Sequence, residues 1–192
     1  MTIRPHLMSD TEVLHVHSIE ITKMLRWVRG HPRCLLDFGE PRSVYADLCK
    51  QSDEPLFVGR RIVLLTGWVV VLNVGVFRSS YTLVPTSRLL WSHIKRTKNW
   101  FILVIIPIPT GSDFSIVIHY HSGDGRVHSL EAGTDEAGSQ WVMQILTGIA
   151  PWHIMGYSED IAREWGRDKT PFFRSKEVAL QEYKDDILGI GE

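Results

Sequence analysis

The chain has 192 residues, which at roughly 100 to 200 residues per domain is enough for one domain with an appendage but too few for two full domains. Hydrophobic residues make up 44% and charged residues 22% of the chain, and this ordinary globular composition excludes disordered, collagen-like and coiled-coil proteins. Twenty-one basic and 22 acidic residues give a formal net charge of −1, so the chain has no global basic field that would hold nucleic acid.

The two cysteines, Cys34 and Cys49, are too few for a disulfide framework in a chain of this size. We expect both thiols to be reduced. The first residues lack the uninterrupted apolar stretch and the small-residue cleavage site of a secretory signal peptide. These features favour a cytoplasmic protein.

Helical patterns dominate the first part of the chain. Ser9 and Glu12 have the spacing of a capping box, and Gly30 stands where a helix would end, so we expect a helix from Ser9 to Gly30. In the first half of this segment polar and apolar residues partly alternate, so a strand is the alternative there. A second, shorter helix is expected from Pro41 to Lys50, because apolar residues share one face there and proline stands near the start.

The run from Ile62 to Phe77 is largely apolar, but a membrane-spanning helix needs about 20 such residues. Asn73 and Gly75 interrupt the run, and its many valines favour strands. We therefore expect a buried hairpin. The second apolar run, from Trp100 to Ile108, keeps a membrane span as the alternative.

From Arg60 onward, short runs rich in valine, isoleucine and aromatic residues alternate with turn residues, a pattern typical of strands. The expected strands are Arg61–Leu65, Trp68–Asn73, Ser80–Val84, Leu89–Lys95, Trp100–Ile106, Phe114–His121 and Arg126–Glu131. The Gly-Asp-Gly sequence at 123–125 predicts a hairpin between the last two. Pro107 and Pro109 are expected to end their strand, because proline cannot donate to a ladder.

An amphipathic helix is expected directly after the strands. Thr134 or Asp135 is the candidate cap, and apolar residues one turn apart, Trp141 among them, predict a buried face. Gly148 and Pro151 predict its end. Two further helices are expected over Ser158–Trp165 and Ser175–Leu188.

Seven antiparallel strands followed at once by one amphipathic helix form the element order of a pleckstrin-homology-like (PH-like) barrel, in which the helix plugs one open end. The sequence resembles that superfold over Arg60–Ala150, and Trp141 stands where such domains commonly carry a tryptophan. Further residues resemble bacterial PH-like proteins of unassigned function. These are Val84, Pro85, Leu90, Trp91, Pro151, Gly156, Tyr157, Ser158 and Trp165.

The resemblance implies an α+β fold, namely a seven-stranded antiparallel PH-like barrel capped by a C-terminal helix, with extra N- and C-terminal helices. It divides the chain into a helical N-terminal extension (1–58), the barrel with its capping helix (59–151) and a helical C-terminal extension (152–192). The superfold hosts lipid-binding, peptide-binding and scaffolding roles. Its phosphoinositide-binding members carry basic residues around the loop between the first two strands. Here that loop is Thr66-Gly67, without Lys or Arg, so no lipid-binding residue is carried over.

Histidines form one candidate site. His119 and His121 are two residues apart on an expected strand and therefore share a face. Depending on the length of the hairpin loop, His128 lies opposite one of them or on the other face. Three neutral imidazoles with an open fourth position match a catalytic zinc site, whereas the alternative is a polar outer strand face. His15 and His17 form a second pair only if their segment is a strand.

A local basic cluster interleaved with aromatic residues forms a second candidate site. Basic residues beside aromatic ones contact phosphates or anionic headgroups, whereas the alternative is a solvated edge strand that resists pairing with its neighbours. The cluster consists of Arg88, Trp91, His93, Lys95, Arg96, Lys98 and Trp100.

The sequence contains no HExxH, GxSxG, Walker or CxxC motif. It therefore favours a non-enzymatic PH-like interaction or assembly module without a cofactor. Such a module would bind a protein or peptide in a groove between an edge strand and a helix, or a second copy of itself as a homo-oligomer. The alternatives are a metal-dependent hydrolase that holds zinc with the three histidines, and a peripheral protein that binds an anionic membrane surface through the basic cluster.

Overall fold

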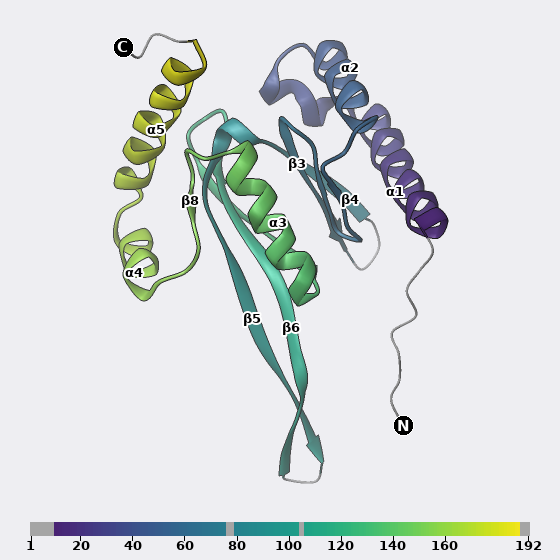
Figure 1. Cartoon of the computed structure of the whole chain (residues 1–192), viewed down its shortest axis with the longest axis vertical. Helices are drawn as coiled ribbons and strands as arrows, with labels where there is room; N and C mark the ends of the chain where they lie inside the picture. Colours follow the sequence, from purple (N-terminus) through teal and green to yellow (C-terminus); the bar gives the residue numbers. More distant parts are fainter. Residues whose placement is uncertain (1–9, 76–78, 104–105, 189–192) are drawn as a thin grey trace.

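The computed structural model describes residues 10–75, 79–103 and 106–188, with side chains described for 19–75, 79–98 and 111–186. The fold is α+β, as the sequence predicts, with helices and strands largely segregated along the chain (Figure 1). The helices are α1 (Asp10–Gly30), η1 (Pro32–Phe38), α2 (Pro41–Ser52), η2 (Thr86–Arg88), α3 (Glu136–Ile149), α4 (Glu159–Arg167) and α5 (Thr170–Leu188). The strands are β1 (Phe57–Val58), β2 (Ile62–Leu64), β3 (Trp68–Val74), β4 (Ser79–Pro85), β5 (Leu89–Leu103), β6 (Ile106–His121), β7 (Val127–Thr134) and β8 (Ile154–Met155).

The described strands form two four-stranded sheets. The first has the order β1-β2-β3-β4 and the second the order β7-β6-β5-β8. All neighbouring strands are antiparallel except β5 and β8, which are parallel. Four consecutive strands thus make the first sheet, three make most of the second, and α3 follows directly.

The valine-rich run of the first sheet is apolar on both faces because both faces are buried. Ile62 and Val71 face an inner core that the two sheets share, whereas Val63 and Val70 belong to an outer core beneath α1, η1 and α2. The run therefore folds as the expected hairpin, β2 and β3. Among the described residues, no helix is long and apolar enough to cross a membrane.

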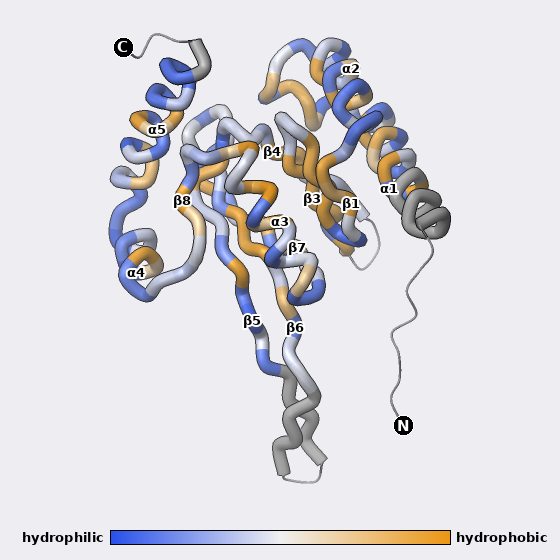
Figure 2. The backbone as a smooth tube through the Cα atoms, in the orientation of Figure 1, coloured by the Kyte–Doolittle hydropathy of each residue, from blue (hydrophilic) through white to orange (hydrophobic). Residues whose placement is uncertain are grey.

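The N-terminal helices form the layer that covers the outer face of the first sheet (Figures 1 and 2). Met24 and Val28 of α1 and Leu48 of α2 are fully buried there. The indole Nε1 of Trp68 donates to Asp47 Oδ2 at 3.0 Å, which fastens α2 to β3. The strand alternative for the first half of α1 is wrong, because Asp10–Gly30 is one continuous helix.

Helix α3 begins at the predicted cap. The Asp135 side chain accepts a hydrogen bond from the Gly138 amide at 2.6 Å, and Val142 and Leu146 are fully buried in the inner core. Trp141, however, was expected on the buried face and is 53% exposed. The helix turns its narrower aliphatic stripe to the sheets, which leaves the indole at the surface.

The described strands do not form the expected seven-stranded barrel. Closing it would require β7 to hydrogen-bond to the edge of the first sheet, whereas the two sheets remain separate. Two of the expected strands, 89–95 and 100–106, are largely one strand, β5. Pro107 and Pro109 do not end a strand, since β6 runs through both. An edge strand tolerates proline where the missing N–H would face away from the ladder.

Strands β5 and β6 extend beyond the rest of their sheet as a two-stranded hairpin (Figure 1). We define the arm as residues Thr97–Leu103 together with Ile106–Asp113, which pair with each other. Strand β7 joins β6 only from Phe114 onward. An irregularity in the pairing after Asn99 leaves one extra residue in β6, which marks a β-bulge in the arm.

Candidate functional site

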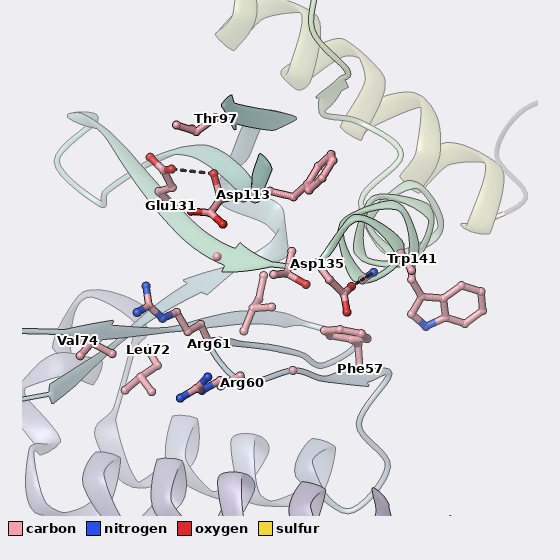
Figure 3. A pocket seen from close by; sticks show the side chains of 18 residues that line it. Phe57, Arg60, Arg61, Leu72, Val74, Thr97, Asp113, Glu131, Asp135 and Trp141 are labelled. Atoms are coloured by element: carbon pink, nitrogen blue, oxygen red, sulfur yellow. Dashed lines mark hydrogen bonds between the residues drawn. The ribbon is translucent and has the colours of Figure 1, made fainter. Parts of the chain in front are cut away.

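A cleft of about 1370 Å³ separates the two sheets where a closed barrel would be sealed (Figure 3). One wall is formed by β1, β2 and the end of β3. The opposite wall is formed by β7, the neighbouring part of β6 and the first turns of α3. Among the described strands, β7 is the last of its sheet, so the edge to which none of them pairs borders the cleft.

The charged residues of the cleft come from opposite walls. Arg60 and Arg61 line it on the β2 side, and Asp113 lines it on the β6 side. None of these three forms an ion pair within the part of the chain that the structure describes. Arg61 reaches across, because its Nη1 lies 3.9 Å from the position that a Cβ on Gly133 would take. The cleft therefore offers the guanidinium group of Arg61 next to the β7 edge, without a carboxylate partner among the described residues.

Two further carboxylates of the cleft already have partners. Glu131 accepts hydrogen bonds from Lys95 Nζ at 2.9 Å and from Ser115 Oγ at 2.7 Å, and these two donors, Lys95 first, lower the pKa of its carboxyl. Asp135 is occupied as the cap of α3. Both carboxylates are held by these contacts. Arg60, Arg61 and Asp113 are therefore the charged residues of the cleft without an ion-pair partner among the described residues.

Aromatic side chains stand at one end of the cleft. Phe57 lines the β1 wall and Trp141 lines the α3 wall (Figure 3). Tryptophan is enriched among the residues that contribute most to protein interfaces, and Trp141 is 53% exposed. Sequence reasoning placed Trp141 in the core, and it missed the cleft as a whole because the walls come from segments that are distant in the chain.

The three predicted zinc ligands do not converge. The strand register places His119 opposite Ser129 and His121 opposite Val127, whereas His128 lies opposite Tyr120 on the other face of the sheet. The loop spans five residues, 122–126, and this odd number reverses the face of His128. No group of three or more His, Cys, Asp or Glu residues within the described ranges could hold a metal ion. His15 and His17 lie on α1, and their side chains are outside the described set.

His119 belongs to an aromatic cluster beneath α4 and α5. Its ring stacks on Trp91 with a centroid separation of 4.7 Å, and Trp91 also stacks on His93 at 4.4 Å. The Trp165 ring lies 4.7 Å from the His119 ring and 4.7 Å from that of Phe172. We call Trp91, His93, His119, Tyr157, Trp165 and Phe172 the aromatic cluster.

The imidazoles of the aromatic cluster are buried and only partly hydrogen-bonded. His119 Nδ1 lies 2.7 Å from Ser129 Oγ, while His119 Nε2 and His93 Nδ1 have no hydrogen-bond partner in the described structure. Burial, then His93 and Lys169, lowers the pKa of His119 from 6.5 to about 4. Burial, then Lys95, lowers the pKa of His93. Both rings are therefore neutral near pH 7 and pack as aromatic groups.

His121 fastens α5 to β6. Its Nε2 accepts a hydrogen bond from Lys176 Nζ at 2.8 Å, which is consistent with an Nδ1–H that donates to Ser122 O at 3.2 Å. Burial lowers the pKa of the Lys176 ammonium, and burial together with Lys176 lowers the pKa of His121. The pair is a structural contact between the C-terminal helix and the sheet.

The basic cluster is divided among different surroundings. Arg88 donates to Asp37 O and lies over the Phe38 ring, Lys95 pairs with Glu131, and Arg96 donates to Ser112 Oγ. Trp91 and His93 are buried in the aromatic cluster. Lys98 is exposed on the arm, and the Trp100 side chain lies outside the described residues. The cluster therefore does not form one continuous basic surface.

Ser92 and His153 form a contact that resembles a nucleophile and its base. Ser92 Oγ lies 2.6 Å from His153 Nε2, and His153 Nδ1 lies 2.5 Å from Ala150 O. Ser92 is 0% exposed and His153 is 6% exposed, so no substrate reaches the hydroxyl. The contact satisfies buried polar groups where β8 joins β5.

In comparisons with known proteins, no family model, curated protein or solved structure matched the chain.

Proposed function

We propose that the protein is a non-enzymatic interaction module with PH-like architecture, which binds an extended peptide segment of a partner protein in the cleft. The main support for this proposal is the edge of β7, to which no described strand pairs and which lies along a cleft of about 1370 Å³. An extended peptide added to an edge strand gains main-chain hydrogen bonds, and adjacent pockets select its side chains. The order of four strands, three strands and one helix supports the PH-like assignment.

The charges and the aromatic residues define the peptide. Arg60 and Arg61 favour an acidic side chain, because neither has a carboxylate partner in the described ranges. Phe57 and Trp141 favour an apolar side chain at the other end of the cleft. The proposed ligand is therefore an extended peptide that carries an acidic residue and, further along, an apolar anchor.

Selection from a displayed library of random peptides tests this proposal. Enriched peptides are expected to contain both an acidic residue and an apolar residue. They should bind the Trp141→Ala variant about thirtyfold more weakly than the wild type, since an interface tryptophan contributes about 2 kcal/mol. Arg61→Glu is expected to weaken the same peptides at low salt. Affinities are measured by fluorescence anisotropy.

Arg126→Glu is the matched control, because Arg126 is exposed on the β6–β7 loop and pairs only with the neighbouring Asp124 in the described structure. Its affinities should equal those of the wild type. A library that yields no peptide, or peptides that bind Trp141→Ala and Arg61→Glu as tightly as the wild type, would contradict the proposed function.

A further inference from the structure

The arm is the part of the fold that has no strand beside it within the described chain. Thr97–Leu103 pairs only with Ile106–Asp113, β7 joins β6 first at Phe114, and β8 pairs with β5 only at Trp91 and Ser92. Both outer edges of the arm therefore present unpaired backbone groups. An isolated two-stranded hairpin is marginally stable in water, and an unpaired edge is a template for another strand.

The distal residues of the arm are apolar in type. The four pairs from Trp100↔Pro109 to Leu103↔Ile106 contain no polar residue. Because successive residues of a strand belong to opposite faces, both faces of the ribbon carry apolar residue types. Strands with this composition occur in sheets that are covered on both faces. The sequence and the backbone register together indicate a segment that is built for burial.

The two edges of the arm differ in their capacity to pair. Pro107 and Pro109 lie on β6 and have no N–H to donate. The hydrogen bonds between β5 and β6 are kept when the nitrogens of these prolines face away from β5. The outer edge of β6 therefore lacks two N–H donors. The outer edge of β5, which carries no proline along the arm, keeps all of its donors.

We propose that the protein forms a twofold dimer in which the distal β5 strands of two copies, residues 99–103, pair antiparallel through their free edges. The proposal is independent of the cleft. A twofold axis brings the same edge of each copy together, and one antiparallel strand edge is complementary to itself. The product is a four-stranded sheet with the order β6-β5-β5-β6, whose outer edges are the proline-containing ones.

A second copy fits this edge better than a lipid bilayer. Hydrocarbon offers no hydrogen bonds, so each open backbone group of an inserted ribbon would cost several kcal/mol. A second β5 strand supplies hydrogen bonds and apolar contact together. Lys95, Arg96 and Lys98 stand at and near the base of the arm, where charged residues oppose edge pairing, and this confines the pairing to the distal part.

Sedimentation velocity of the full chain across a concentration series tests the proposal. The wild type is expected to show a monomer–dimer equilibrium, and Ile102→Pro is expected to raise the dimer Kd at least about tenfold. Ile102 lies opposite Pro107, and two opposite residues of an antiparallel pair have their N–H and C=O groups either both toward each other or both outward. Pro107 has no N–H to donate to β5, so the backbone N–H of Ile102 faces outward as well. A proline at position 102 therefore removes a donor from the free edge without breaking the hairpin. Leu103→Lys, which retains every backbone donor, is expected to weaken the dimer as well.

Pro107→Val is the matched control, because it alters the opposite edge and should not weaken the dimer. Circular dichroism and thermal unfolding verify that each variant is folded. A wild type that remains monomeric at about 100 µM, or a dimer with the same Kd in the wild type and Ile102→Pro, would overturn the proposal. A monomer that floats with vesicles of phosphatidylcholine and phosphatidylserine would assign the arm to a membrane surface instead.

Discussion

Replacement of Trp91 by alanine is expected to lower the free energy of unfolding by about 3–5 kcal/mol, the usual cost of removing a buried tryptophan. Trp91 is 3% exposed, and its ring contacts both imidazoles of the aromatic cluster as well as Trp165. Its Nε1 donates to Gly156 O at 2.7 Å. The side chain therefore joins β5 to the C-terminal helices, and alanine would leave a cavity between these layers.

Urea unfolding followed by circular dichroism measures this loss. Trp141→Ala is the control, since that side chain is 53% exposed and the same truncation there should change the free energy of unfolding by less than about 1 kcal/mol. A similar change for both variants would show that the aromatic cluster does not stabilise the fold.

Acidification from pH 6.5 to 4 is expected to reduce the stability of the protein by about 2–3 kcal/mol through His119 alone. The unfolded chain protonates this imidazole near its ordinary pKa of 6.5, whereas the folded protein does so only near 4. Between these values the unfolded state binds more protons, so the free energy of unfolding falls as the pH falls and levels off below the folded pKa. Above pH 6.5 this contribution to the pH dependence vanishes.

Free energies of unfolding at a series of pH values test this linkage. Both His119→Phe and His119→Gln should reduce the slope between pH 4 and 6.5 by about one proton, whatever their effects on packing. The lowered pKa values of His93, His121 and His153 leave some pH dependence in each variant. Equal slopes in the wild type and both variants would rule out a buried neutral His119 as the cause.

Local signals predicted the helices well. The helix end at Gly30 and the cap at Asp135 appear where the sequence places them, because capping depends on residues within one turn. Helix α4 begins at Glu159, one residue after the expected start at Ser158. Helix α5 begins at Thr170 rather than at Ser175, since Phe172 packs into the aromatic cluster. That contact depends on a distant part of the chain.

The candidate sites were harder to predict than the elements. Sequence spacing correctly put His119 and His121 on one face of β6. The face of His128 depended on the length of the β6–β7 loop, because a change of one residue in that loop moves every side chain of β7 to the other face of the sheet. Trp91, which sequence reasoning placed in the basic cluster, is buried in the aromatic cluster instead. The cleft could not be predicted, because Arg61 and Gly133 meet only after the two sheets are placed.

The sequence by itself determined the α+β class, the positions of most helices and strands, and the double-sided burial of the β2–β3 hairpin. These features follow from periodicity, capping and turn chemistry within short segments. Only the tertiary structure decided that the sheets stay open along the cleft, that β5 and β6 extend as an arm, and that Trp141 faces solvent. Each of these depends on the balance of hydrogen bonds and buried area between segments far apart in the chain, and no local pattern encodes that balance.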